Sequence, residues 1–176
     1  GNSIIQFLKS CNIVVGLNFL THNMSDNKVL SRCNELMSRT NQLNVSGSKF
    51  NDNEFNEMIM DHSDKFYFTV SDSFGSYGIV GFLNCSFEIN KLTIHNLVIS
   101  CRVAKKLIEN SVMNGLVNYY LPKPISSIVV EYTKTSRNTP IYESFIEMGF
   151  TKDDFNLCCD TSNLNNSSEI IKINIC

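Results

Sequence analysis

The chain has 176 residues, of which 43% are hydrophobic and 18% charged, and its formal net charge is −2. These values fit one globular domain with a full hydrophobic core rather than a disordered chain. Sequence-independent binding of nucleic acid needs clustered Lys and Arg side chains. The sequence has no such cluster, so we expect no nucleic-acid partner. No window approaches the roughly 18 consecutive apolar residues of a membrane span, and the first residues lack a signal-peptide pattern. We therefore expect no membrane partner and a cytoplasmic location.

The first third of the chain predicts a strand followed by two helices. Residues 13–19 alternate apolar and small side chains, as a strand does. The polar run Ser25-Asp26-Asn27 offers N-cap chemistry for a helix. The apolar side chains of this helix share one face: Val29, Leu30, Cys33, Leu36 and Met37. A polar loop at 40–44 follows, and residues 51–54 start a second, short helix.

The middle of the chain predicts an antiparallel meander of three strands, over 65–71, 78–88 and 92–99. In the third strand the apolar positions change parity at His95 and Asn96. A β-bulge at these residues would reset the phase. A strand buried on both faces would show the same pattern, and the sequence leaves both interpretations open.

A helical crossover is predicted after the meander. Ser100 is expected to cap a long helix that Leu121-Pro122 stops. Residues 128–132 read as the next strand, parallel to its spatial neighbour because a helix connects the two.

The end of the chain predicts one more helix and two strands. Pro140 lies in the first turn of the helix, and Gly149 ends it. Residues 155–159 form a strand, and 170–175 form a final edge strand. The expected fold is α/β, with a mixed twisted sheet of six to seven strands flanked by about four helices.

This order of elements resembles the GNAT (GCN5-related N-acetyltransferase) fold, and residues 147–150 look like the Gly-Phe ending of that fold's late helix. Three segments carry a narrower resemblance: 39–44 (RTNQLN), 100–103 (SCRV, with Glu109) and 135–138 (TSRN). They resemble the C-terminal domain of FkbH-like proteins, which join a HAD-type phosphatase domain to a GNAT-like domain. As a family, these proteins load a glyceryl unit from a phosphorylated three-carbon donor onto an acyl carrier protein for polyketide-type pathways. The resemblance implies two partners, a HAD-type phosphatase domain in the same or a neighbouring chain and an acyl carrier protein.

We expect a single GNAT-like domain over residues 1–176. Its fold core spans 13–150, and 151–176 adds C-terminal strands and a loop. The chain begins with Gly and lacks a DxDxT phosphatase motif, so we expect it to be cut from a longer polypeptide.

A resemblance to GNAT proteins also implies a cofactor site, for CoA or for the phosphopantetheine arm of a carrier protein. In that fold the helix after the bulged strand receives the pyrophosphate on its first backbone N–H groups, where small residues let the phosphates approach. The residues implied to contact the cofactor are Leu97, Val98, Ile99, Arg102, Lys105, Lys106 and Asn138.

Two positions depart from the GNAT pattern. Aligned on Arg102, the motif Arg/Gln-x-x-Gly-x-Gly/Ala places Lys105 and Leu107 at its two small positions, where side chains would crowd the phosphates. Lys105 and Lys106 could instead add charge to a phosphate, or be solvated lysines in the first turn of a helix. Phe145 stands where acetyl-transferring members have a Tyr that protonates the leaving thiolate. Ordinary acetyl transfer from acetyl-CoA is therefore not expected.

Cys101 is the candidate catalytic residue. The chain has seven cysteines without a CxxC pair or zinc-type spacing, so we expect no metal site. Cys101 lies at the predicted helix N-terminus beside Arg102, and both features lower the pKa of a thiol. Such a thiolate could carry an acyl group as a thioester. A buried cysteine packed under the helix is the alternative, and His95 could face Cys101 across the strand end or be a structural residue.

The loop after the first helix holds a dense polar cluster: Arg39, Asn41, Gln42 and Asn44. It is predicted either to contact a ligand or another domain, or to be held by its own side-chain-to-backbone hydrogen bonds. The favoured function is a GNAT-like domain of an FkbH-like protein that supports glyceryl or acyl transfer to an acyl carrier protein. The alternatives are a stand-alone CoA-dependent N-acyltransferase and a non-catalytic interaction module.

Overall fold

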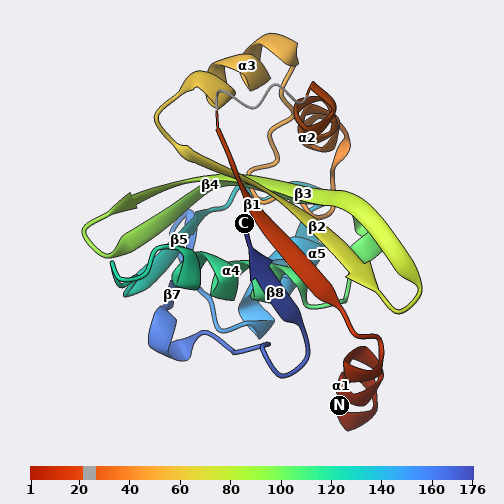
Figure 1. Cartoon of the computed structure of the whole chain (residues 1–176). Coiled ribbons are helices and arrows are strands. Elements are labelled where there is room, and N and C mark those ends of the chain that lie inside the picture. The colour runs from red at the N-terminus through yellow and green to blue at the C-terminus, as the bar shows by residue number, and fades with distance from the viewer. Residues whose placement is uncertain (22–26) are drawn as a thin grey trace.

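The computed structural model describes residues 1–21 and 27–176, which form an eight-stranded mixed sheet with helices on both faces (Figure 1). The strands lie in the order β6-β7-β5-β4-β3-β2-β1-β8. Their bounds are β1 (Val14–Leu20), β2 (Asp64–Asp72), β3 (Gly75–Glu88), β4 (Lys91–Ile99), β5 (Ser127–Glu131), β6 (Thr151–Asp153), β7 (Asn156–Asp160) and β8 (Lys172–Ile175).

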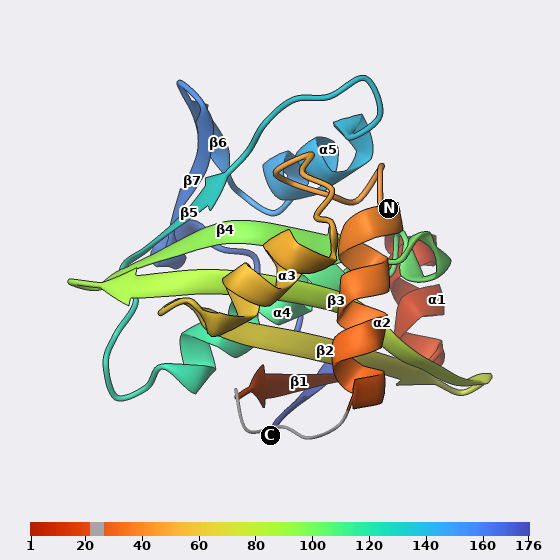
Figure 2. The ribbon, with the colours of Figure 1, turned by 90° about the horizontal axis from the view of Figure 1, so that it is seen from above.

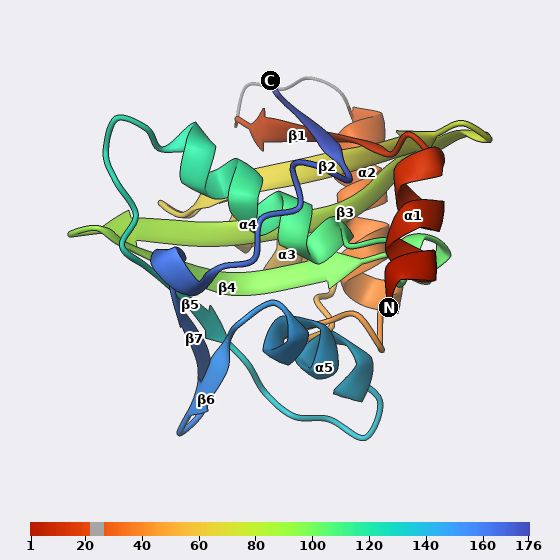
Figure 3. The ribbon, with the colours of Figure 1, turned by 90° about the horizontal axis from the view of Figure 1, so that it is seen from below.

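Two helices lie on one face of the sheet (Figure 2), and three lie on the other (Figure 3). The first pair is α2 (Asn27–Arg39) and α3 (Asp52–Met60), and the second group is α1 (Asn2–Ser10), α4 (Ile108–Tyr119) and α5 (Thr139–Glu147). Each face has its own apolar cluster: Phe55 and Phe82 pack beneath α2 and α3, and Phe66 and Phe145 pack on the opposite side. The sheet is therefore the shared wall between two cores.

Several predicted elements are confirmed. Strands β2, β3 and β4 form the antiparallel meander, and β4 pairs with β5 in parallel, as a connection through α4 requires. Helix α3 starts with a capping box, in which the Asn51 side chain accepts the Glu54 N–H and the Glu54 carboxylate accepts the Asn51 N–H. The cap predicted at Ser25-Asp26-Asn27 lies in part outside the described residues.

The β-bulge in β4 is present. Asn84 of β3 pairs with Asn96, but Cys85, the next residue of β3, pairs with Ile94, so His95 is the extra residue. The last four residues of β4 are all buried. Both interpretations of the pattern therefore apply, the bulge at His95 and burial on both faces beyond it.

The helix predicted from Ser100 starts later than expected. The Ser100 hydroxyl accepts the Arg102 N–H, but this cap opens only a short 3-10 turn over Cys101–Val103. The chain then passes through an irregular loop, and α4 begins at Ile108. A side-chain cap bonds only to backbone N–H groups two or three residues away. It can therefore be satisfied by a single turn and does not require a long helix to follow.

The sheet and the helix set are also larger than predicted. In the described residues there are eight strands and five α-helices rather than six to seven and about four. The additions are α1, for which we predicted no helix, and the short strand β6, which pairs only with β7. The predicted last edge strand is present as β8, which pairs in parallel with β1.

Gly81 should be required for the packing of β3 on β2. A Cβ atom added there would lie 1.9 Å from the Phe68 ring, so Gly81→Ala should lower the free energy of unfolding by about 1–3 kcal/mol. Urea denaturation measures the loss. Adding Phe68→Leu should recover part of it, because the clash is with that ring; equal stability of wild type and Gly81→Ala would contradict this packing.

Candidate functional site

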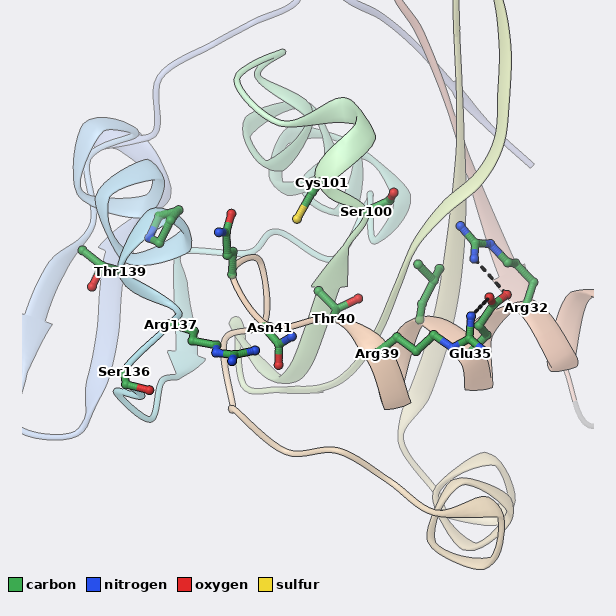
Figure 4. Close-up of a pocket in the computed structure, with 13 residues that line it drawn as sticks. Arg32, Glu35, Arg39, Thr40, Asn41, Ser100, Cys101, Ser136, Arg137 and Thr139 are labelled. Atoms are coloured by element: carbon green, nitrogen blue, oxygen red, sulfur yellow. Dashed lines mark hydrogen bonds and ion pairs between the residues drawn. The ribbon is translucent and has the colours of Figure 1, made fainter.

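A pocket of about 680 Å³ opens at the carboxyl end of β4, between the end of α2 and the start of α5 (Figure 4). Its volume is within the usual range for small-molecule sites. We call it the Cys101 pocket. It is lined by Arg32, Glu35, Leu36, Arg39, Thr40, Asn41, Gln42, Ser100, Cys101, Ser136, Arg137, Thr139 and Pro140.

Three sequence segments that are far apart in the chain meet at this pocket. Residues 39–42 follow α2, residues 100–101 follow β4, and residues 136–140 precede and begin α5. Each lies within or next to one of the segments RTNQLN, SCRV and TSRN. The Cys101 thiol points into the space between the other two segments (Figure 4).

Arginine side chains dominate the charge of the pocket. Arg32 and Arg39 both bind the Glu35 carboxylate, at 2.9 and 3.0 Å. The guanidinium of Arg137 has no ion-pair partner among the described residues, and it extends toward Asn41 (Figure 4). With three arginines and one carboxylate, the lining favours an anionic group.

Cys101 is exposed, unlike the buried thiols of the core. The predicted reasons for its activation are absent, because a 3-10 turn rather than α4 begins there, and the Arg102 guanidinium lies 5.7 Å from the centre of the Tyr77 ring. Burial raises the pKa of the Cys33 and Cys85 thiols to about 12. Cys101 is thus a candidate nucleophile through access to the pocket rather than through a helix dipole.

His95 does not serve Cys101. Its ring nitrogens contact Ser86 and Glu131, and Cys101 follows six positions later along an extended strand, which amounts to about 20 Å. Of the two interpretations of His95, the geometry excludes the one in which the imidazole faces Cys101.

Another segment of the same chain pairs with the backbone of the predicted cofactor residues Leu97, Val98 and Ile99. Pairing of β4 with β5 ends at Ile94 and Val130, and residues 43–45 fill the gap beyond. The N–H of Val45 donates to the Leu97 carbonyl at 3.1 Å, and the N–H of Ile99 donates to the Leu43 carbonyl at 2.9 Å.

Asn138 fastens this inserted segment, and its side chain is fully buried. Its amide group donates to the carbonyls of Asn44 (3.0 Å) and Thr133 (2.8 Å). Its side-chain oxygen accepts from the Tyr132 hydroxyl (3.1 Å) and the Thr135 N–H (2.8 Å). The cofactor contact predicted for Asn138 would require this side chain to leave these four partners.

The polar cluster 39–44 divides between the two predicted roles. Arg39, Asn41 and Gln42 line the pocket. Asn44 instead holds the loop, because its amide donates to the carbonyls of Thr40 (3.2 Å) and Ser48 (2.9 Å).

The loop between β4 and α4 keeps an unusual backbone shape. Lys105 and Leu107, which stand at the two small positions of the GNAT motif, both have φ of 60°. This left-handed conformation favours glycine and costs other residues about 1 kcal/mol or more each.

Lys106 anchors this loop to the β2–β3 hairpin. Its ammonium donates to the Asp72 carboxylate at 3.0 Å and to the Tyr77 hydroxyl at 3.2 Å. Desolvation opposes the charged form of each partner, but the hydrogen bonds between them prevail, so the pKa of Lys106 is raised and that of Asp72 is lowered. Lys106 is therefore engaged within the fold rather than directed at the Cys101 pocket.

Comparison with solved structures decides the fold. The ribosomal-protein-S18-alanine N-acetyltransferase of Escherichia coli superposes with a TM-score of 0.58 at 8% identity, covering 83% of this chain and 93% of that chain. Tetrahymena GCN5 gives 0.52 at 13% identity, with 82% and 94% covered. The chain has the GNAT fold.

A third GNAT structure was obtained with a ligand. The PaiA N-acetyltransferase of Thermoplasma acidophilum, in complex with coenzyme A, gives a TM-score of 0.51 at 12% identity, with 82% of this chain and 96% of that chain covered. No protein-family model and no curated protein matches the sequence significantly.

Some residues of the site were not predicted. Arg32, Glu35, Arg137 and Thr139 line the pocket, yet none was selected as a site residue. Arg137 lies inside the TSRN segment and could have been selected on that ground. Among the described residues, no group of three His, Cys, Asp or Glu side chains could hold a metal ion, and no helix is long and apolar enough to cross a membrane.

Replacement of Asn138 should loosen the whole inserted segment. Asn138→Ala leaves several buried groups without partners, so we expect the free energy of unfolding to fall by about 3 kcal/mol. Urea denaturation measures the change. Asn41→Ala, which removes an amide that faces the pocket, is the matched control and should cost less than about 0.5 kcal/mol; equal losses would contradict the role of Asn138.

Thiol reactivity should follow exposure. In the folded chain at neutral pH, iodoacetamide should modify the exposed Cys101 and Cys176 before the other cysteines. Cys33 and Cys85 should react only after unfolding, because burial both raises their pKa and blocks the reagent. Peptide mass mapping over time tests the order, and early modification of Cys33 would refute it.

Proposed function

We propose that this chain is the GNAT-like domain of an FkbH-like protein and that it supports transfer of a glyceryl or related acyl unit to an acyl carrier protein. One observation carries the proposal. The three segments of the narrower resemblance, although separated along the chain, line a single pocket around an exposed thiol.

The proposed chemistry uses Cys101 as an acyl carrier within the pocket. The thiolate of Cys101 attacks the carbonyl carbon of the donor, a C–S bond forms, and the bond to the donor's leaving group breaks. The thiol of the carrier's phosphopantetheine arm then attacks this thioester, and Cys101 leaves as thiolate. The guanidinium of Arg137, which no described carboxylate neutralises, would bind an anionic group of the donor or of the arm.

The partners of this proposal are a HAD-type phosphatase domain, in the same or a neighbouring chain, and the acyl carrier protein. The phosphatase would act on the phosphorylated three-carbon donor. The Cys101 pocket opens at the carboxyl end of β4, between loops (Figure 4), which is compatible with the approach of a long flexible arm.

A CoA-dependent N-acyltransferase is the second candidate. The left-handed backbone at Lys105 and Leu107 favours it, since this is the shape that lets a loop approach phosphates. The neighbour in complex with coenzyme A has the same fold. Two observations argue against it. Residues 43–45 already form hydrogen bonds with the backbone at the end of β4, and the Phe145 side chain has no proton to donate to a leaving thiolate.

The first candidate predicts a covalent adduct on Cys101. Incubation with glyceryl N-acetylcysteamine thioester, a surrogate for the loaded arm, should add one glyceryl group, which holo acyl carrier protein then removes. Intact-mass and peptide mapping detect it. Cys101→Ala should lose the adduct and Cys176→Ala, which removes the other exposed thiol, should keep it. No adduct on the wild type, or an unchanged adduct on Cys101→Ala, would overturn the thioester role.

Calorimetric titration with acetyl-CoA separates the two candidates. The hydrogen bonds of residues 43–45 to β4 predict weak or no binding. Micromolar affinity would instead support the CoA-dependent enzyme.

A further inference from the structure

A second constellation of reactive groups lies on the sheet face that carries α3, away from the Cys101 pocket. Ser86 of β3, His95 of β4 and Glu131 of β5 come from three neighbouring strands. The Ser86 Oγ lies 2.8 Å from His95 Nε2, and His95 Nδ1 lies 3.0 Å from Glu131 Oε1. The bulge makes this possible, because His95 is the residue that the β3–β4 register leaves unpaired.

The hydrogen bonds determine which atom of the imidazole is basic. A carboxylate only accepts, so the contact with Glu131 requires the hydrogen to be on Nδ1. In the neutral ring Nε2 then carries the lone pair, and it accepts the hydroxyl hydrogen of Ser86. The three groups therefore have the order and the ring orientation of a Ser-His-carboxylate triad, which is recognised by geometry and not by position in the chain.

Substrates can reach these groups. The His95 side chain is 30% exposed, and Ser86 is half-buried. Ser86 and His95 together line two adjoining depressions of about 650 and 400 Å³. Thr93 lies directly opposite Ser86 in the β3–β4 register and lines the smaller one.

The charge of the larger depression restricts the substrate. Its lining includes Glu54, Glu57 and Asp61 but no Lys or Arg, and Asp61 is paired with the buried Lys65. The smaller depression adds Glu88, Glu131 and one cation, Lys91. Anionic substrates such as phosphorylated acids would be repelled, whereas uncharged or cationic esters would be accepted.

We propose that Ser86 is a nucleophile for acyl transfer from uncharged or cationic carboxylic esters, with His95 as its general base and Glu131 as the positioning residue of the imidazole. The Oγ attacks the carbonyl carbon, and His95 Nε2 takes the hydroxyl proton. Collapse of the intermediate breaks the ester C–O bond, and the imidazolium returns the proton to the departing alkoxide. Water then attacks the acyl carbon while His95 Nε2 takes its proton, the bond from this carbon to Ser86 Oγ breaks, and the imidazolium returns the proton to Oγ, which releases the acid and restores the serine. This site is independent of the Cys101 pocket, and neither needs the other.

Covalent labelling tests the proposal on the full chain. A fluorophosphonate probe, which is uncharged and selective for activated serines, should label Ser86, and peptide mapping should locate the phosphonate there. Ser86→Ala should abolish the label, and His95→Ala should slow labelling by about 100-fold or more. Ser168→Ala is the control, because Ser168 is an exposed serine that lines neither depression; Ser86 of this variant should be labelled at the wild-type rate.

The role of Glu131 needs a readout that a merely structural residue would not change. Glu131→Gln should slow labelling strongly, while Glu131→Asp, which keeps the carboxylate, should recover part of the rate. Circular dichroism should show all variants folded. Cys101→Ala should leave the label on Ser86 unchanged, which keeps this proposal separate from the thioester one. Absence of label on wild-type Ser86, or labelling that persists in His95→Ala at the wild-type rate, would overturn the proposal.

Discussion

The antiparallel bridge between residues 43–45 and the end of β4 shapes the rest of the functional region. Strand β5 leaves β4 after Ile94, and without another partner the buried N–H and C=O groups at the end of β4 would be unsatisfied. The chain supplies its own partner there, since Leu43 and Val45 exchange hydrogen bonds with Ile99 and Leu97. An unpaired buried backbone group costs about 1–3 kcal/mol, so this bridge is a structural requirement once the strands diverge.

The same bridge fixes the Cys101 pocket. It positions residues 39–42 beside the end of β4, and Asn138 ties Asn44 to the loop that leads into α5. One buried amide thereby holds two walls of the pocket together. The pocket between these walls is lined by three arginines and holds the exposed Cys101.

The bulge at His95 creates a different surrounding near the middle of β4. It turns an imidazole toward polar groups of β3 and β5 on the sheet face that carries α3. The inserted segment and the bulge together give one strand two chemically different surroundings, an arginine-lined pocket at its carboxyl end and an acid-lined depression near its middle.

Local patterns in the sequence determined much of the fold. Alternating apolar residues predict the meander, and Pro140 and Gly149 bound α5, because each depends on the conformational preferences of a few neighbouring residues. The parity change at His95 and Asn96 predicts either a bulge or burial on both faces, and β4 has both. The order of these elements was enough to indicate the GNAT fold. Within the candidate site, the sequence led us to propose Cys101 and the three segments, and the structure places residues of all of them around one pocket.

Only the tertiary structure decided where helix α4 begins and which groups meet. The Ser100 side chain caps a short turn, but Lys106 binds Asp72 on a hairpin that is distant along the chain. Helix α4 begins only after the loop that contains Lys106. The hydrogen bond from Asn138 to the Asn44 carbonyl joins residues 94 positions apart, and the Ser86-His95-Glu131 contacts join residues on three different strands. Such contacts depend on strand register and on the closure of long loops, and no periodic pattern in the sequence predicts either of them.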